Sequence, residues 1–178
     1  MDPPLWACVQ GKVARRIEGN DRVVYVTPAS VHAMGAKFLF AVLHLLALAI
    51  GLAAVYARWR ALRRVKDQHD TEAVLHADSW YGLAALLWVG TGVMRAFGGL
   101  EKGTEHYMGN PWFLAKMALF LIVLGLELKP MSTFMTWRAL RGKKTPMDLS
   151  GTSTLATLTI LQLPLLALMV FFAAAMAR

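Results

Sequence analysis

The sequence predicts an all-α integral membrane protein, an up-down four-helix bundle with an N-terminal polar tail. The chain of 178 residues is 57% hydrophobic and 17% charged, whereas soluble domains are about 45–50% apolar and about 25% charged. Four segments are long and apolar enough to cross a bilayer core, which requires about 20 helical residues. These segments follow one another closely along the chain, and short connections join antiparallel neighbours in a bundle.

The four predicted helices lie near residues 38–57, 78–97, 111–128 and 153–175. The first contains no charged residue, and His44 is its one group that ordinarily titrates near neutral pH. The second is uncharged from Ser79 to Met94. The third begins at Asn110-Pro111, which is typical of an N-cap followed by the first helical residue. The fourth contains Pro164, which we expect to kink it, and its most polar interior residue is Gln162.

Basic residues are concentrated in two of the three loops. The first and third loops hold five each, and the second holds only Lys102. By the positive-inside rule, the first and third loops lie in the cytoplasm and both termini lie outside. We therefore expect a multi-pass protein of a bacterial inner membrane. The basic residues counted are Arg58, Arg60, Arg63, Arg64 and Lys66 in the first loop, and Lys129, Arg138, Arg141, Lys143 and Lys144 in the third.

Residues 1–33 form the predicted polar tail, and residues 34–178 form the transmembrane domain. The tail carries four basic residues, which resist translocation, and it has no apolar run of the length that a signal peptide requires. Arg22 to Pro28 is compatible with a short strand, but nothing in the tail indicates a domain. Two interpretations stay open: translation starts at Met34, or the tail crosses the membrane or lies at its surface. Cys8 is the only cysteine, which excludes an internal disulfide and a cysteine-based zinc site, and we predict no metal site.

A block of polar residues in apolar context connects the second and third helices and continues beyond the third. The block resembles an uncharacterised family of bacterial membrane proteins, domain of unknown function 2214, and the resemblance covers most of residues 36 to 178. It implies four transmembrane helices and no established activity. The residues that carry it are Arg95, Glu101-Lys102-Gly103, Tyr107, Asn110-Pro111, Phe113, Lys116, Leu119-Phe120, Pro130 and Trp137-Arg138.

A fainter likeness concerns a histidine early in the first helix, His44, and a lysine a few residues into the third, Lys116. This layout is similar to that of HemJ-type protoporphyrinogen oxidases and CopD-type copper-resistance membrane proteins. The likeness implies haem b as a cofactor, because HemJ-type proteins bind it. The third helix of those proteins commonly begins with a histidine and lysine pair. Here Leu114 or Phe113 stands in the place of that histidine.

Three polar residues, His44, Arg95 and Lys116, are expected at similar depth near the outer leaflet. His44 lies about 9 Å along the first helix and Lys116 about 7–8 Å along the third, at 1.5 Å per residue. Arg95 closes the second helix on the same side. We predict that they converge on a site for a cofactor or an anion. His44 would be a ligand of the cofactor, and Arg95 and Lys116 would bind carboxylates of the bound molecule. The alternative is a histidine hydrogen-bonded across helices and cations that reach lipid phosphates.

Two carboxylates, Asp78 and Glu127, are expected on the inner side. They could form a proton path, or they could pair with Arg58, Arg60 or Lys129 at the inner interface, which we favour. Glu127 and Lys116 share one face of the third helix, but about 16 Å of helix separates them, so each needs a partner on another helix. Intramembrane charges are costly and are usually retained for a reason.

The sequence leaves the function open between different classes. The first hypothesis is a haem- or tetrapyrrole-linked redox protein. The alternatives are a small transporter or a lipid- or anion-binding module, or an accessory subunit without chemistry. Whether the protein is an enzyme stays open, and so does a homo-oligomer. The expected partner is the lipid bilayer and not nucleic acid, because the excess of Lys and Arg over Asp and Glu, 19 against 11, fits cytoplasmic loops.

Overall fold

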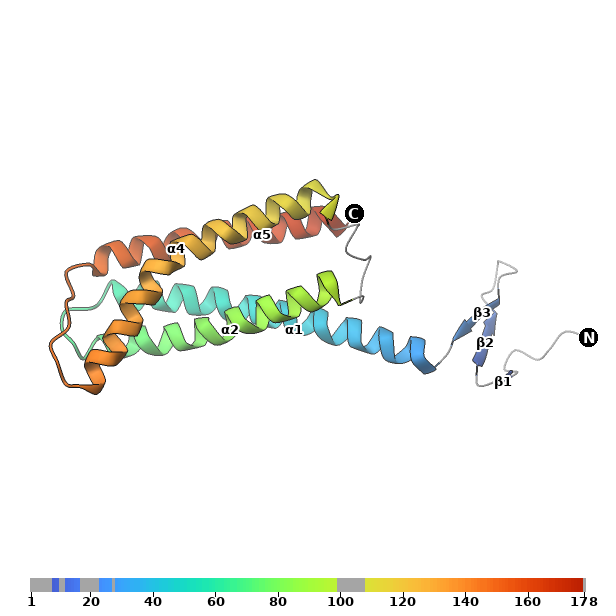
Figure 1. Ribbon diagram of the computed structural model, residues 1–178, viewed down its shortest axis with the longest axis horizontal. Helices are drawn as coiled ribbons and strands as arrows, with labels where there is room; N and C mark the ends of the chain where they lie inside the picture. The colour runs from blue at the N-terminus through green and yellow to red at the C-terminus, as the bar shows by residue number, and fades with distance from the viewer. Residues whose placement is uncertain (1–7, 10–11, 17–22, 27, 99–107, 178) are drawn as a thin grey trace, which may run out of the picture.

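Four long helices make up most of the protein, as predicted. The computed structural model describes residues 8–9, 12–16, 23–26, 28–98 and 108–177 (Figure 1). The loops 63–70 and 143–151 lie at one end of the bundle, and the C-terminus lies at the other (Figure 1). The all-α membrane bundle is therefore confirmed. The helices are α1 Pro28–Leu62, α2 Thr71–Phe97, α4 Pro111–Gly142 and α5 Thr152–Ala177.

The bundle has apolar side chains on its outside, as expected for contact with lipid tails. Phe38, Leu86, Leu121 and Phe171 are each more than 60% exposed. Soluble proteins rarely expose large contiguous apolar surfaces, whereas a bilayer solvates them. Several polar side chains are instead buried at the centre of the bundle, among them a fully buried arginine. This distribution places the whole bundle in a membrane.

Within the residues that the structure describes, three helices are apolar enough to cross a membrane by length and composition: Met34–Leu62, Pro111–Gly142 and Thr152–Met176. The expected second span, near 78–97, does not reach that criterion. Glycine, threonine and tryptophan interrupt its apolar residues, and Arg95 lies in its last turn. This helix, α2, nevertheless packs along α1, with which it makes its most extensive contacts. Its place in the bundle thus follows from packing, which hydropathy does not measure.

Two clusters of buried apolar residues hold the helices together. The inner cluster lies near the loops 63–70 and 143–151 and draws on all four helices. The outer cluster lies farther along the bundle and joins α1, α4 and α5, with Tyr81 and Trp88 of α2 packed against it. The inner cluster comprises Leu62, Val74, Leu75, Phe134, Trp137, Leu155 and Ala156, and the outer cluster comprises Val55, Val123, Leu166 and Met169.

Helix α4 continues through Pro130, where the prediction of a helix ending at Leu128 was wrong. Proline lacks the N–H that would donate to the carbonyl one turn earlier, and it usually bends a helix rather than ending it when both flanks are packed. Pro130 is buried, and Phe134 and Trp137 beyond it are buried in the inner cluster. Figure 1 shows the first part of α4 beside α5 and the last part turned toward α2. The turn brings Arg138 into the bundle.

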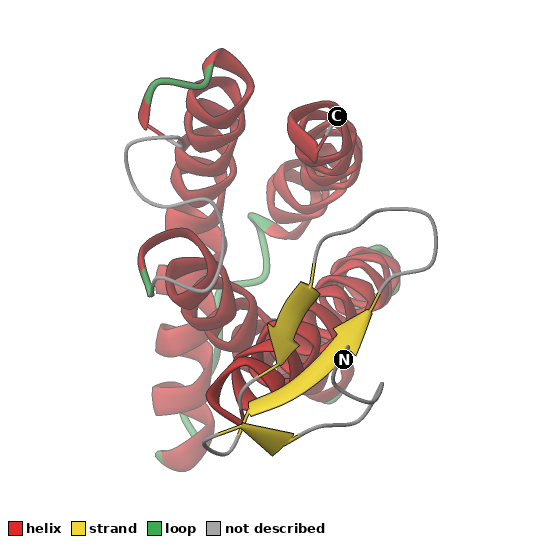
Figure 2. Cartoon of the chain, turned by 90° about the vertical axis from the view of Figure 1, so that its right-hand side faces the viewer, coloured by secondary structure: helices red, strands yellow, loops and turns green. Residues whose placement is uncertain are grey.

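The N-terminal segment contains more structure than the sequence indicated. Helix α1 begins at Pro28, ten residues before the expected start at 38, with a proline at its first position, where no N–H is needed. Before it, β1 Cys8–Val9, β2 Lys12–Arg16 and β3 Val23–Val26 form an antiparallel sheet in the order β1-β2-β3. In its register Val13 lies opposite Val26. Figure 1 shows the three strands beyond the start of α1, and in the view of Figure 2 they lie in front of the helices.

Candidate functional site

A cavity of about 390 Å³ lies between the helices at the end of the bundle away from the loops 63–70 and 143–151. Its lining includes His44 of α1, Arg95 of α2 and Lys116 of α4. The structure therefore brings the three predicted outer residues to one cavity, from three helices. Their roles in binding stay predictions. The apolar part of the lining includes Leu48, Phe113, Phe120, Met169 and Val170.

The ring of His44 is oriented by two residues of α2. Its Nδ1 lies 2.9 Å from the hydroxyl oxygen of Thr91. The Thr91 hydroxyl donates its single proton to the Leu87 carbonyl at 2.6 Å. With that proton engaged, the hydroxyl oxygen can accept from His44 Nδ1–H, and the tautomer with Nδ1–H carries the lone pair of the ring on Nε2. The Trp88 ring stacks on the imidazole with centroids 5.4 Å apart.

The backbone of α2 comes close to His44 at Gly92. A Cβ at this position would lie 3.2 Å from His44 Cε1, closer than ordinary side-chain contacts. Trp88, Thr91, Gly92 and Arg95 fall on one face of α2, at the i, i+3, i+4 and i+7 spacing. Of this face, only Arg95 was predicted from the sequence as a site residue. The helical spacing is the signal that could have identified the other three.

The polar part of the cavity consists mostly of donors. Arg95 lies in the last turn of α2, where a cation is favoured by the helix dipole. Lys116 lies near the start of α4, whose first turn is capped by the Asn110 side chain, which accepts from the Trp112 N–H at 2.9 Å. Trp88 Nε1 is buried and has no hydrogen-bond partner in the part of the chain that the structure describes. No carboxylate belongs to the described lining. The arrangement suits a negatively charged group.

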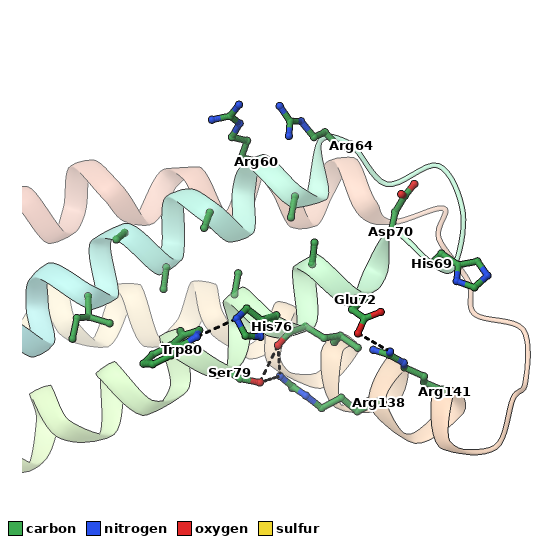
Figure 3. Close-up of a pocket in the computed structure, with 18 of the residues that line it drawn as sticks. Arg60, Arg64, His69, Asp70, Glu72, His76, Ser79, Trp80, Arg138 and Arg141 are labelled. Carbon is green, nitrogen blue, oxygen red and sulfur yellow. Dashed lines mark hydrogen bonds and ion pairs between the residues drawn. The ribbon is translucent and has the colours of Figure 1, made fainter.

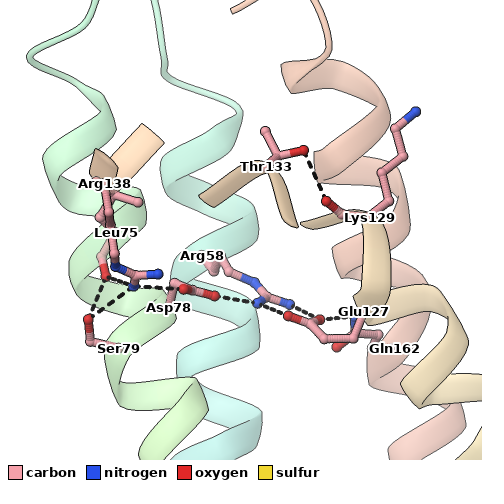
Figure 4. A network of polar contacts seen from close by, with 9 residues as sticks. All are labelled: Arg58, Leu75, Asp78, Ser79, Glu127, Lys129, Thr133, Arg138 and Gln162. Carbon is pink, nitrogen blue, oxygen red and sulfur yellow. Dashed lines mark hydrogen bonds and ion pairs between the residues drawn. The ribbon is translucent and has the colours of Figure 1, made fainter. Parts of the chain in front are cut away.

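The two inner carboxylates meet at one fully buried arginine, Arg58 (Figure 4). Its guanidinium donates to both oxygens of Glu127 at 2.6 Å and to Asp78 at 2.9 Å. Arg138 pairs with the other oxygen of Asp78 at 2.7 Å. Gln162 donates to Glu127 at 2.6 Å. This set of five residues, the inner network, includes members from all four helices.

The inner network is neutral, with two cations and two carboxylates. Arg58 was counted with the first loop, but its side chain lies inside the bundle, 4.4 Å from the centre of the Tyr81 ring. Of the partners considered for the carboxylates, Arg58 is the one that both contact. Arg138 and Gln162 were not considered as partners. Gln162 stood out as the most polar interior residue of its helix, but nothing in the sequence indicated that α4 would bend Arg138 toward Asp78.

The comparisons with known proteins identify a family. A family model described as a predicted membrane protein, DUF2214, matches residues 36–178. No curated protein and no solved structure matches the chain. The likeness to HemJ-type and CopD-type proteins finds no support in these comparisons. Because the match covers most of the chain, including the cavity and the inner network, the protein belongs to the DUF2214 family of predicted membrane proteins.

Proposed function

We propose that this membrane protein binds an anionic amphiphile, a molecule with an acidic head and an apolar body, in the outer cavity. The single observation behind the proposal is that two cations from different helices, Arg95 and Lys116, line one cavity whose other walls are largely apolar. We place the protein in a bacterial inner membrane, with the cavity toward the outer leaflet, as the loop charges favour.

The chemistry of the walls supports this class of ligand. Charge-assisted hydrogen bonds from Arg95 and Lys116 would hold a carboxylate or phosphate. The buried Trp88 Nε1–H would add a neutral donor. The apolar side chains would cover the rest of the ligand, and the volume of about 390 Å³ lies within the range of small-molecule sites.

Packing below the cavity favours binding over passage through the bundle. Met169 lines the cavity and also belongs to the outer cluster, together with Val55, Val123 and Leu166. These four side chains are each at most 6% exposed. They separate the cavity from the inner network by a layer of close-packed apolar atoms. A transporter would have to open this layer, whereas a binding module would leave it intact.

The test is binding of a fluorescent fatty acid to the purified protein in detergent. Lys116→Gln and Arg95→Gln each remove one charge-assisted bond, so we expect affinity to fall about tenfold to 150-fold, from about 1.5–3 kcal/mol. Lys37→Gln is the matched control, because Lys37 is an exposed cation of α1 outside the cavity. Equal losses of affinity in all three variants would show that the effect comes from the net charge of the protein and not from the cavity. That result would refute the proposal.

A second candidate, a haem-linked redox function, is favoured by one observation, the orientation of His44. An imidazole whose Nδ1–H is held by a hydrogen bond presents Nε2 as a ligand atom. The same cations would hold haem propionates. The test is the absorption spectrum of the protein expressed in cells supplied with a haem precursor. A Soret band lost in His44→Ala would support this candidate, and a spectrum without the band would exclude it.

A further inference from the structure

A second hollow lies at the opposite end of the bundle, between α1, α2 and the last turns of α4 (Figure 3). We call it the inner groove. It has a volume of about 1470 Å³ and is open to its surroundings. Its floor is formed by small side chains, so the two helix backbones are only thinly covered. The floor residues are Ala53, Ala57 and Ala61 of α1 and Ala73 and Ala77 of α2.

Cations predominate along the edges of the inner groove. Four arginines line it, Arg60, Arg64, Arg138 and Arg141, against the two carboxylates Asp70 and Glu72. Figure 3 shows Arg60 in the last turn of α1 and Arg64 just beyond that helix at one edge, and the other two arginines on α4 near the other edge. The imbalance leaves the groove with a net positive charge, beside an apolar floor.

Neither carboxylate compensates the positive charge of Arg60 or Arg64. Glu72 pairs with Arg141 across α2 and α4 at 3.1 Å. Asp70 accepts the backbone N–H groups of Lys66 at 2.7 Å and Asp67 at 3.3 Å. These bonds lower the pKa of the Asp70 carboxyl and hold the carboxylate in its own loop. The positive charge of Arg60 and Arg64 is therefore left for a partner from outside the described chain.

We propose that the inner groove binds an anionic phospholipid of the adjacent leaflet, with its phosphate at Arg60 and Arg64 and an acyl chain along the alanine floor. Arg60 and Arg64 lie at and just beyond the C-terminal end of the membrane span Met34–Leu62. Lipid head groups are expected at this depth. Trp80 also lines the groove and is half exposed, at 49%. Basic pockets between membrane helices on the cytoplasmic side commonly hold anionic head groups.

Charge favours a lipid over a second copy of the chain. A symmetric dimer through this face would bring the same patch of both subunits together. Arg60 and Arg64 of each copy would then lie near those of the other, and like charges in contact are unfavourable. An anionic lipid offers the opposite charge and an apolar chain in one molecule. This site is distinct from the outer cavity, so neither proposal depends on the other.

The experiment is native mass spectrometry of the full chain in detergent with phosphatidylglycerol or phosphatidylcholine of identical acyl chains. We expect preferential retention of phosphatidylglycerol. The double variant Arg60→Gln/Arg64→Gln should lower its affinity roughly 25-fold, about fivefold per arginine, since each basic residue near the surface contributes about 1 kcal/mol. Phosphatidylcholine binding should stay unchanged. Arg63→Gln is the matched control, an exposed arginine of the same segment that does not line the groove.

A second variant tests the floor with all charges in place. Ala57→Leu adds bulk at an exposed floor position and should weaken binding of both lipids. Circular dichroism would verify that each variant keeps its helices. An equal loss in Arg63→Gln would assign the effect to general surface charge and overturn the proposal. So would equal retention of both lipids by the wild type, or a dimer that forms through this face and excludes lipid.

Discussion

Replacing Arg58 by methionine should be among the most destabilising single changes in the protein. The side chain is fully buried and makes three short hydrogen bonds to two carboxylates. Its loss would leave Glu127 with the Gln162 amide as its remaining partner in the inner network, whereas Asp78 would keep Arg138. Breaking a buried ion pair by removing one partner costs about 3–5 kcal/mol, because it leaves a buried charge without compensation.

A double-mutant cycle separates this pairing from simple loss of packing. Glu127→Leu alone leaves Arg58 with Asp78, so we expect a smaller loss than for Arg58→Met. Arg58→Met/Glu127→Leu removes one cation and one carboxylate and leaves the Asp78–Arg138 pair intact. Its loss should therefore be smaller than the sum of the two single losses by about 2–3 kcal/mol, within the range for residues that share a network.

The assay is unfolding by sodium dodecyl sulfate in mixed micelles, followed by circular dichroism, which gives a free energy for each variant. Arg63→Met is the control, because it removes the same charge from an exposed position and should change stability by no more than about 0.5 kcal/mol. Additive losses in the cycle would refute the reasoning, since additivity means that the two side chains do not interact. A change in Arg63→Met as large as that in Arg58→Met would refute it too.

Three further predictions concern topology, the cavity and the N-terminal segment. After replacement of the native cysteine, a cysteine at Glu105 should react with an impermeant thiol reagent on intact cells and one at Arg63 should not, and the reverse pattern would overturn the topology. Gly92→Ala should push the histidine ring out of place, lower fatty-acid affinity and be about 1 kcal/mol less stable than Gly90→Ala, because both variants gain the helix propensity of alanine but only the first is overpacked. Gly90→Ala is its control, because a Cβ there meets nothing within 4 Å. A chain that begins at Met34 should insert and melt like the full chain, and a large drop in its thermal stability would show that the preceding strands and first turns of α1 are structural.

Long runs with few charged residues were sufficient to predict the four helices and their order, although α2 is less apolar than the three helices that qualify as membrane spans. They did not predict where the helices end. Helix α4 continues past Pro130 because residues beyond the proline are buried against α1, α2 and α5, and that burial depends on the tertiary structure. The same limit applies to α1, which begins ten residues earlier than its apolar run. A helix outside the bilayer needs no apolar run.

The sequence predicted the outer site better than the inner network. Depth along each helix follows from counting residues, so His44, Arg95 and Lys116 could be expected at one level before the cavity was known. The partners of Asp78 could not be found in this way, since Arg138 reaches it only through the bend of α4. Arg58 was misleading for another reason. A count of loop charges treats each cation near a helix end as solvated, and it does not say which face of the helix the side chain occupies.

The surroundings of the charged residues distinguish the part of the bundle that serves structure from the part that would bind a ligand. The inner network contains two cations and two carboxylates, so it is neutral by itself and needs no further partner to hold the helices. Arg95 of α2 and Lys116 of α4 line one largely apolar cavity, and its described lining contains no carboxylate. The contacts between α2 and α4 are sparse, so little packing joins the two helices directly. An anion bound between Arg95 and Lys116 would join the two helices, which is why the outer cavity, rather than the more extensive inner network, is where we expect the function.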